Sequence, residues 1–180
     1  MRGIVVRGVV LALILTGEWL WGSTPGSTGP EQARSSLSPG QPAPDFVAHG
    51  PDGTSFTLRD YQGRPVIINF WATWCAPCRQ EMLALQTVYE AHKPAGLAVL
   101  AVSQDQQDKA EAVRAYWATL ELTFAPLLDP AGSIATDYNV VLLPSTVFVH
   151  PSGTVAAVHV GPMTPTQIER YLRAILAPPG

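Results

Sequence analysis

Two cysteines are the residues of this 180-residue sequence whose type and spacing point most directly to chemistry. They lie three positions apart in the segment Trp74-Cys75-Ala76-Pro77-Cys78. A Cys-x-x-Cys pair between a buried strand and the start of a helix places its first sulfur beside unpaired backbone N–H groups and the positive end of the helix dipole. Such surroundings lower a cysteine pKa from about 8.5 toward neutrality or below and favour the reactive thiolate. The sequence therefore predicts a redox disulfide with Cys75 as nucleophile and Cys78 as the resolving thiol.

Three other uses of the pair are possible: a zinc half-site, a structural disulfide in a non-catalytic binding module, and a thiol peroxidase. A zinc site needs further ligands, but the chain has no other cysteine and its four histidines are scattered. We therefore expect no metal and no cofactor. A peroxidase of the same broad fold needs a Thr-x-x-Cys arrangement, whereas Thr73 precedes Cys75 by only two positions. The peroxidase and the binding module remain as alternatives to a thiol-disulfide oxidoreductase.

The elements that must position the pair alternate between strand and helix. Residues 66–71 form an almost unbroken apolar run, as expected for a strand in the middle of a sheet. A helix begins near the cysteines, with an apolar face made by Cys78, Met82, Leu85 and Tyr89. Further expected elements are hairpins at 45–58 and 146–158, strands at 97–102 and 124–128, and helices at about 107–120, 130–138 and up to 176, the last capped by Thr164 or Thr166. This order predicts an α/β fold with a central mixed sheet flanked by helices.

The N-terminal part of the chain has the composition of a targeting segment. Residues 1–22 combine Arg2 and Arg7 with an apolar middle, which predicts a signal peptide or an N-terminal membrane anchor. Because basic residues stay on the cytoplasmic side, the rest of the chain is expected on the outer side, where disulfides persist. Residues 23–42 are rich in Gly, Ser, Thr and Pro and predict a flexible linker, which leaves 43–180 as one domain. A formal charge of −3 without runs of like charge argues against nucleic acid as a partner.

The residues around the cysteines also carry a family resemblance. Residues 69–81, Asn-Phe-Trp-Ala-Thr-Trp-Cys-Ala-Pro-Cys-Arg-Gln-Glu, closely resemble the thioredoxin-like proteins of the TlpA/ResA type. Counterparts of that family also fall at 42–46, at Gly63, at 103–105 and at 143–146, so the resemblance covers about residues 40–177. It implies a thioredoxin fold with an N-terminal β-hairpin and an inserted strand-helix element. It further implies a place on the periplasmic side of a bacterial cell envelope and, usually, a reducing role.

Single residues can be carried over from the resemblance. Pro144 matches the family's cis-proline, although the sequence alone fits a strand-edge proline equally well. Glu81 matches a functional acid, although by itself it reads as a solvated residue on a helix face. Asn69 stands where ordinary thioredoxins have a buried Asp, and a neutral amide cannot accept the proton there. We therefore assign proton handling to Glu81 and expect Asn69 to be a buried, hydrogen-bonded amide.

The resemblance and the residues near the cysteines also predict which side chains contact the substrate protein, called the client below, and which kind of client is unsuited. The residues expected to contact a client are Trp74, Ala76, Pro77, Leu143 and Pro144. The segment 143–145 lacks the Pro-Glu pair typical of thioredoxins dedicated to cytochrome c maturation, which argues against apocytochrome c as the client. Asp105 and Asp129 are interpreted as helix caps.

The expected activity is reduction of disulfides in exported proteins by dithiol-disulfide exchange. The expected partners are these disulfide-bearing proteins, a membrane thiol as electron donor, and the membrane itself through the N-terminal segment. We expect the protein to act as a monomer.

Overall fold

The computed structural model describes residues 37–106 and 109–176. Its strands are β1 (Val47–His49), β2 (Ser55–Thr57), β3 (Val66–Trp71), β4 (Ala98–Ser103), β5 (Ala125–Leu128), β6 (Ser145–Val149) and β7 (Val155–Val160). Its α-helices are α1 (Ala76–His92), α2 (Ala110–Thr119), α3 (Ser133–Asp137) and α4 (Pro165–Leu176), and its short 3-10 helices are η2 (Leu58–Tyr61) and η3 (Lys93–Ala95). The expected alternation of strands and helices is confirmed.

The seven strands form one mixed sheet in the order β2-β1-β5-β4-β3-β6-β7. Neighbours β3, β4 and β5 are parallel, whereas β6 runs antiparallel to β3 and β7 antiparallel to β6. The hairpin β1–β2 joins the other edge through an antiparallel contact between β1 and β5. This topology with its flanking helices is a thioredoxin-like fold, as the sequence predicts.

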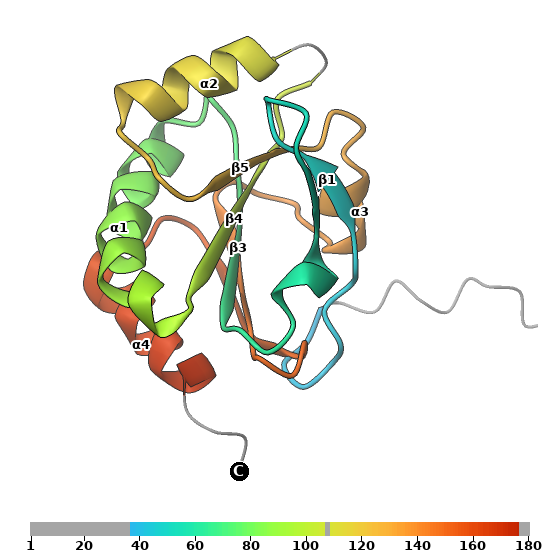
Figure 1. Ribbon diagram of the computed structural model, residues 1–180, viewed down its shortest axis with the longest axis vertical. Helices are drawn as coiled ribbons and strands as arrows, with labels where there is room; N and C mark the ends of the chain where they lie inside the picture. Colours follow the sequence, from blue (N-terminus) through green and yellow to red (C-terminus); the bar gives the residue numbers. More distant parts are fainter. Residues whose placement is uncertain (1–36, 107–108, 177–180) are drawn as a thin grey trace, which may run out of the picture. The chain divides into compact units, whose positions relative to one another are not determined.

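Side chains of the central strand alternate between the two faces of the sheet, as the two-residue period of a strand requires. Ile67 and Trp71 pack with α1, α2 and α4 on one face, and Ile68 and Phe70 pack with α3 and the β1–β2 region on the other. Figure 1 shows the same division, with α1, α2 and α4 on one side of the sheet and α3 on the other. All six residues of β3 are buried, which explains its unbroken apolar sequence.

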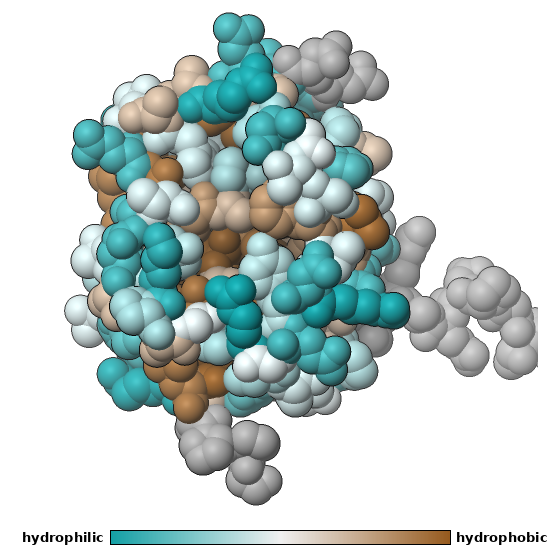
Figure 2. Space-filling view, viewed as in Figure 1, coloured by the Kyte–Doolittle hydropathy of each residue, from teal (hydrophilic) through white to brown (hydrophobic). Residues whose placement is uncertain are grey.

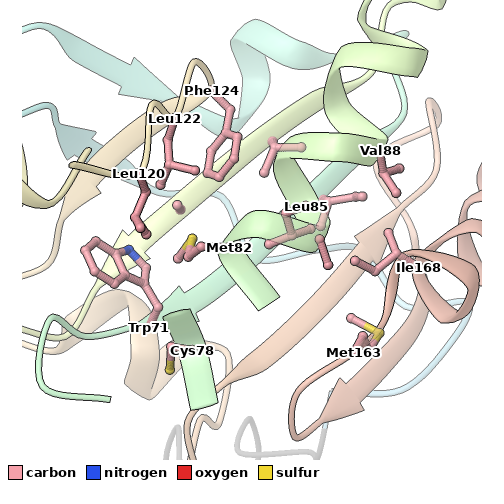
Figure 3. Close-up of a cluster of buried hydrophobic side chains, with 14 of the residues drawn as sticks. Trp71, Cys78, Met82, Leu85, Val88, Leu120, Leu122, Phe124, Met163 and Ile168 are labelled. Atoms are coloured by element: carbon pink, nitrogen blue, oxygen red, sulfur yellow. The ribbon is translucent and has the colours of Figure 1, made fainter. Parts of the chain in front are cut away.

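The core on the α1 side reaches the cysteine pair. Met82 extends from α1 toward Trp71 and Leu120, whereas Val88 lies at the other side of the cluster, next to Ile168 of α4 (Figure 3). Cys78 lies at the edge of this cluster, beside Trp71. The start of α1 is therefore held by packing, and each large side chain buried in this way contributes about 1.5–3 kcal/mol. On the face drawn in Figure 2, apolar residues form a band across the middle and a further group at the lower end, with hydrophilic residues between and around them.

Two helix starts differ from the prediction. Helix α3 begins at Ser133 rather than Pro130, because residues 129–132 form a turn closed by a bond from the Gly132 N–H to the Asp129 carbonyl. Gly132, with a left-handed φ of +67°, occupies the N-cap position. The Asp129 carboxylate nevertheless accepts the Ala135 N–H in the first turn of α3 at 2.9 Å, so Asp129 caps the helix from the preceding turn, as predicted. Helix α2 begins at Ala110 rather than near 107, and residues 107–108 lie outside the described part.

The start of α4 decides between the two threonines proposed as its cap. The Thr164 hydroxyl accepts the backbone N–H of Gln167 at 3.4 Å, and the Gln167 side chain accepts the Thr164 N–H at 2.9 Å. This reciprocal pair satisfies two backbone donors at the helix N-terminus. Thr164 is therefore the cap, and the sequence-based choice between Thr164 and Thr166 is settled.

The folded domain begins before residue 43. The Gly40 N–H donates to the Val155 carbonyl, and the Val155 N–H donates to the Gln41 carbonyl. The last residues of the expected linker therefore belong to the domain, because they pair with the start of β7. The expected targeting segment, residues 1–22, lies outside the described residues. Within residues 37–106 and 109–176, no helix combines the length and the apolar character needed to cross a membrane.

Candidate active site

The cysteine pair lies where the central strand gives way to the first long helix. Cys75 is the N-cap of the 17-residue helix α1, and Pro77 lies in its first turn. The Cys75 sulfur accepts the backbone N–H of Cys78 at 3.3 Å. The two sulfurs form a disulfide, with Cα atoms 5.3 Å apart. A thiolate formed at Cys75 would meet this N–H and the positive end of the helix dipole, as the spacing predicts.

The two sulfurs differ in access. Cys78 is fully buried within the core beside Trp71, whereas Cys75 retains 6% exposure and lines an open groove. A client sulfur that enters the groove therefore meets Cys75, which lines it, before Cys78, which does not. This asymmetry is what a nucleophile and a resolving thiol require.

The groove beside Cys75 has a volume of about 560 Å³ and is formed by three segments: the turn into α1, the residue that follows β4, and the residues that precede β6. It is lined by Trp74, Cys75, Ala76, Pro77, Gln104, Val140, Val141, Leu142 and Leu143. Four of the five residues expected to contact a client are among them. The fifth, Pro144, follows directly and forms the expected cis peptide bond with Leu143. Trp74 is exposed, whereas Trp71 belongs to the core.

Glu81 lies one helical turn beyond Cys78 and is buried, with 1% exposure. The Asn69 side-chain amide donates to the Glu81 carboxylate at 2.8 Å and to the Thr146 hydroxyl at 2.8 Å. Asn69 and Thr146 are direct partners across β3 and β6, and the Thr146 hydroxyl also donates to Glu81 at 3.4 Å. Asn69 faces α1 because it shares the side of β3 that carries Trp71. Glu81 is therefore no solvated acid on a helix face, and Asn69 is the hydrogen-bonded amide that was expected.

The surroundings of Glu81 change its acidity. Burial raises the pKa of the Glu81 carboxyl from 4.5 to about 7, although hydrogen bonds from Asn69, the Met163 backbone and Thr146 act in the opposite direction. A carboxyl group with a pKa near 7 exchanges its proton at neutral pH. The site thus places a proton donor and acceptor one turn from the cysteine pair.

Comparisons with known proteins place this geometry in a family. The AhpC/TSA family matches residues 39–158. The chain belongs to the AhpC/TSA family. It is 42% identical over 137 residues to the thioredoxin-like protein YneN of Bacillus subtilis, which covers 76% of this chain and 79% of YneN. It is 32% identical over 167 residues to the thiol-disulfide oxidoreductase ResA of Bacillus cereus, which covers 93% of this chain and 94% of ResA.

A solved structure gives the same result in three dimensions. A Chlorobium tepidum protein assigned as the thiol:disulfide interchange protein DsbE superposes with a TM-score of 0.72 at 30% identity, covering 79% of this chain and all of that one. The family, the fold and the Cys-x-x-Cys pair together identify this AhpC/TSA-family chain as a thiol-disulfide oxidoreductase that acts by dithiol-disulfide exchange. The resemblance to ResA drawn from the sequence is confirmed.

One residue of this AhpC/TSA-family site has a role that the sequence analysis missed. Asp105 is buried and accepts the backbone N–H of Thr73 at 2.9 Å and its hydroxyl at 2.7 Å. The Ser103 hydroxyl donates to the same carboxylate at 2.8 Å. Thr73 lies in the turn closed by a bond from the Cys75 N–H to the Ala72 carbonyl, so Asp105 fastens the turn that leads into the cysteine pair.

The interpretation of Asp105 as a helix cap is therefore wrong. The N-cap of α2 is Lys109, four residues later. The parallel register of β3 and β4 offered a signal, because the carboxyl ends of adjacent parallel strands lie at the same edge of a sheet. Thr73 and Asp105 each follow one of these ends. A polar residue at each position was consistent with a contact between them.

The same contact bears on the peroxidase alternative. A threonine hydroxyl has one hydrogen to donate, and that of Thr73 goes to Asp105. It cannot also donate to the Cys75 sulfur. Among the described residues, no group of three or more His, Cys, Asp or Glu side chains gathers as a metal site would require.

Proposed function

We propose that this chain reduces disulfides of exported proteins on the outer side of a bacterial membrane, with Cys75 as nucleophile and Cys78 as resolving thiol. The observation that carries the proposal is the asymmetry of the pair: Cys75 caps α1 and lines an open groove, whereas Cys78 is fully buried. The relatives named as thiol-disulfide oxidoreductases support the reaction class. The resemblance to the TlpA/ResA type supports the reducing direction.

The reaction balances within the enzyme and its client. The Cys75 thiolate attacks one sulfur of the client disulfide, so that a mixed disulfide forms and the other client sulfur leaves as a thiolate. The Cys78 thiolate then attacks the Cys75 sulfur and releases the second client thiolate. Two electrons pass from the enzyme dithiol to the client, and the enzyme ends with the Cys75–Cys78 disulfide. A thiol donor at the membrane would return those two electrons.

Glu81 supplies the proton transfer that the resolving step needs. Cys78 must lose its proton before it attacks, although burial in an apolar core raises the pKa of a thiol. Glu81 lies one turn away on the same helix, and its own pKa of about 7 suits a group that takes and returns protons near neutrality. We assign this role to Glu81 rather than to Asn69, whose amide cannot accept a proton.

The location and the partners rest on the N-terminal sequence. Arg2, Arg7 and the apolar run that follows support export, with the domain on the periplasmic side as an anchored or a released protein. The clients are then exported proteins that carry disulfides. We propose a monomer without cofactor, metal or nucleic acid.

The reduction potential of the Cys75–Cys78 pair tests the direction of electron flow. Equilibration of the full-length chain with glutathione buffers, read by mass spectrometry of trapped thiols, gives this value. We expect a potential near or below that of thioredoxin, about −270 mV. A value near −120 mV, as in a strong oxidant, would contradict a reducing role.

Cysteine variants test the assigned roles. Cys75→Ser should abolish reduction of insulin disulfides, because no thiolate remains in the groove. Cys78→Ser should retain the attack and accumulate mixed disulfides, because the resolving thiol is gone. The same variants separate the alternatives. Reduction of insulin by Cys75→Ser would support the binding module, and rapid turnover of hydrogen peroxide by the unaltered chain would support the peroxidase.

A further inference from the structure

Beside Cys75 lies a pair of strongly exposed aliphatic side chains that the proposed function does not use. Val141 is 76% exposed and Leu142 is 63% exposed, and both line the groove opposite the loop that carries Trp74. We call Val141 and Leu142 the aliphatic ridge. With Trp74, which is 71% exposed, they are three of the four most exposed large apolar residues in the described part of the chain. Exposed apolar side chains that gather around one groove are typical of an interaction site.

The ridge is held in place. The Val140 N–H donates to the Ala135 carbonyl of α3 at 2.8 Å, and the Leu142 carbonyl accepts the Ser145 hydroxyl at 2.7 Å. The ridge is thus tied to α3 on one side and to the start of β6 on the other. A surface that is ordered before binding loses little conformational entropy when a partner docks.

The groove beside the ridge has no acidic or basic side chain. None of its nine lining residues is Asp, Glu, Lys, Arg or His, so the Cys75 thiolate of the reduced enzyme is the one charge among them, and Gln104 provides the one side-chain amide. A client segment with a charged residue next to its cysteine would lose hydration there without gaining an acidic or basic partner. A segment with a large apolar residue at that position would bury it against Trp74 and the ridge, which is favourable.

We propose that the aliphatic ridge selects clients whose disulfide cysteine is flanked by large apolar residues in an extended, unfolded segment. The client must lie in this groove during the reaction, because its sulfur has to reach Cys75, which lines the same groove as the ridge. Large apolar residues are buried in folded proteins, so they reach the groove in chains that have not yet folded or have lost their fold. This inference rests on the proposed function and specifies its substrate class.

Two peptides closed by an internal disulfide test the proposal. The two peptides have the same sequence between their cysteines except at one position. They differ only at the two residues on either side of the first cysteine, which are Leu in one peptide and Ser in the other. The full-length chain in mild detergent is reduced, and stopped-flow tryptophan fluorescence gives the second-order rate constant of its oxidation by each peptide. Hydroxyethyl disulfide, which is small and uncharged, serves as the reference substrate. We expect the Leu peptide to react about tenfold faster than the Ser peptide.

The double variant V141S/L142S should lose this preference and keep its rate with hydroxyethyl disulfide within about twofold. Its matched control is V47S/L83S, which changes one exposed Val and one exposed Leu outside the groove and should behave as the unaltered chain. A second variant, Val141→Asp, should favour a peptide with Lys at the flanking positions. Equal rates for the Leu and Ser peptides, or a preference that survives in V141S/L142S, would overturn the proposal.

Other occupants of the ridge give different results. Self-association in sedimentation velocity that V141S/L142S abolishes would assign the ridge to a second copy of the chain. Binding of the domain to neutral phosphatidylcholine vesicles that the same variant abolishes would assign it to a lipid surface. Either result would overturn the proposed client class. If the unaltered chain does not react with hydroxyethyl disulfide at all, the proposed function itself is refuted. Failure of the client class and failure of the proposed function can therefore be distinguished.

Discussion

At the scale of single residues, the site depends on a buried carboxyl that three polar groups surround. Glu81 receives hydrogen bonds from Asn69, Thr146 and the Met163 backbone, yet its pKa rises to about 7 because burial outweighs them. Proteins rarely bury an acid in this way without a use for it. In the proposed mechanism that use is proton transfer with Cys78, which lies one helical turn before Glu81.

The raised pKa of Glu81 predicts a definite dependence of stability on pH. The unfolded chain releases the Glu81 proton near pH 4.5, whereas the folded chain releases it near pH 7. The contribution of Glu81 to the free energy of unfolding is therefore fully present below pH 4.5 and is lost as pH rises through about 7. Glu81→Gln cannot ionise. We expect its free energy of unfolding to match that of the unaltered chain at pH 4 and to exceed it by up to about 3 kcal/mol at pH 8.

Urea unfolding of the oxidised chain at a series of pH values measures this difference. The oxidised form is used because its cysteines are joined and do not titrate. The control is Glu111→Gln, which removes an exposed carboxyl of α2 and should leave the pH dependence unchanged. A Glu81→Gln chain that loses stability equally at pH 4 and pH 8 would mean that the carboxyl acts through its hydrogen bonds alone.

The sequence predicted the cysteine pair fully and its supporting residues in part. A spacing of three residues and a helix start are local properties, so the pairing of Cys75 with Cys78 and its place at the start of α1 could be derived from the sequence. The contact of Glu81 with Asn69 joins α1 to β3, and Thr146 joins both to β6. Such contacts depend on strand register, which sequence periodicity does not give. For that reason Glu81 by itself read as a solvated acid.

At the scale of elements, the cysteine pair depends on how the end of β3 is fastened to the end of β4. The bounds of β3 were predicted correctly because all its residues are buried and form a continuous apolar run. The turn that follows β3 was not predicted, since the acceptor of its Thr73 N–H and hydroxyl is the Asp105 carboxylate, 32 positions beyond Thr73. The interpretation of Asp105 as a cap failed for this reason: a buried Asp after a strand serves the nearest unpaired donors in space, which here belong to Thr73.

Asp105→Asn should loosen the turn that presents Cys75. Asn keeps one acceptor but turns an N–H group toward the donors of Thr73 and Ser103, so we expect a loss of about 1–3 kcal/mol in unfolding free energy. We also expect a severalfold slower reaction of Cys75 with hydroxyethyl disulfide, because the loosened turn would no longer hold the Cys75 sulfur against the N–H groups at the start of α1. Urea unfolding and stopped-flow fluorescence measure the two effects.

Asp129→Asn is the matched control for Asp105→Asn. Asp129 is equally buried, but its carboxylate accepts the Ala135 N–H of α3 at 2.9 Å and does not contact the cysteine turn. It should lower stability and leave the rate with the small disulfide unchanged. Equal slowing by both variants would show that Asp105 acts through general stability and not through the turn.

At the scale of the whole molecule, α1 is held at both ends by different parts of the fold. Its N-terminus adjoins the turn that Asp105 fastens, and its C-terminus lies against α4, where His92 contacts Glu169 at 2.9 Å. Leu172 of α4 is fully buried in the core that Cys78 joins. The contacts of α4 with the C-terminal end of α1 thus lie apart from the residues that line the groove.

This arrangement predicts that a destabilising substitution in α4 lowers the free energy of unfolding and leaves the reaction rate of Cys75 unchanged. Leu172→Ala should reduce the free energy of unfolding by about 2–5 kcal/mol, because it leaves a cavity in the core that the neighbouring side chains fill only in part. Leu176→Ala, on the same helix but 40% exposed, should cost less than about 1 kcal/mol and serves as the control. At 15 °C, with circular dichroism confirming that the chain is folded, both variants should oxidise with hydroxyethyl disulfide at the rate of the unaltered chain. A slower reaction of folded Leu172→Ala would instead mean that packing of α4 is transmitted along α1 to the cysteine pair.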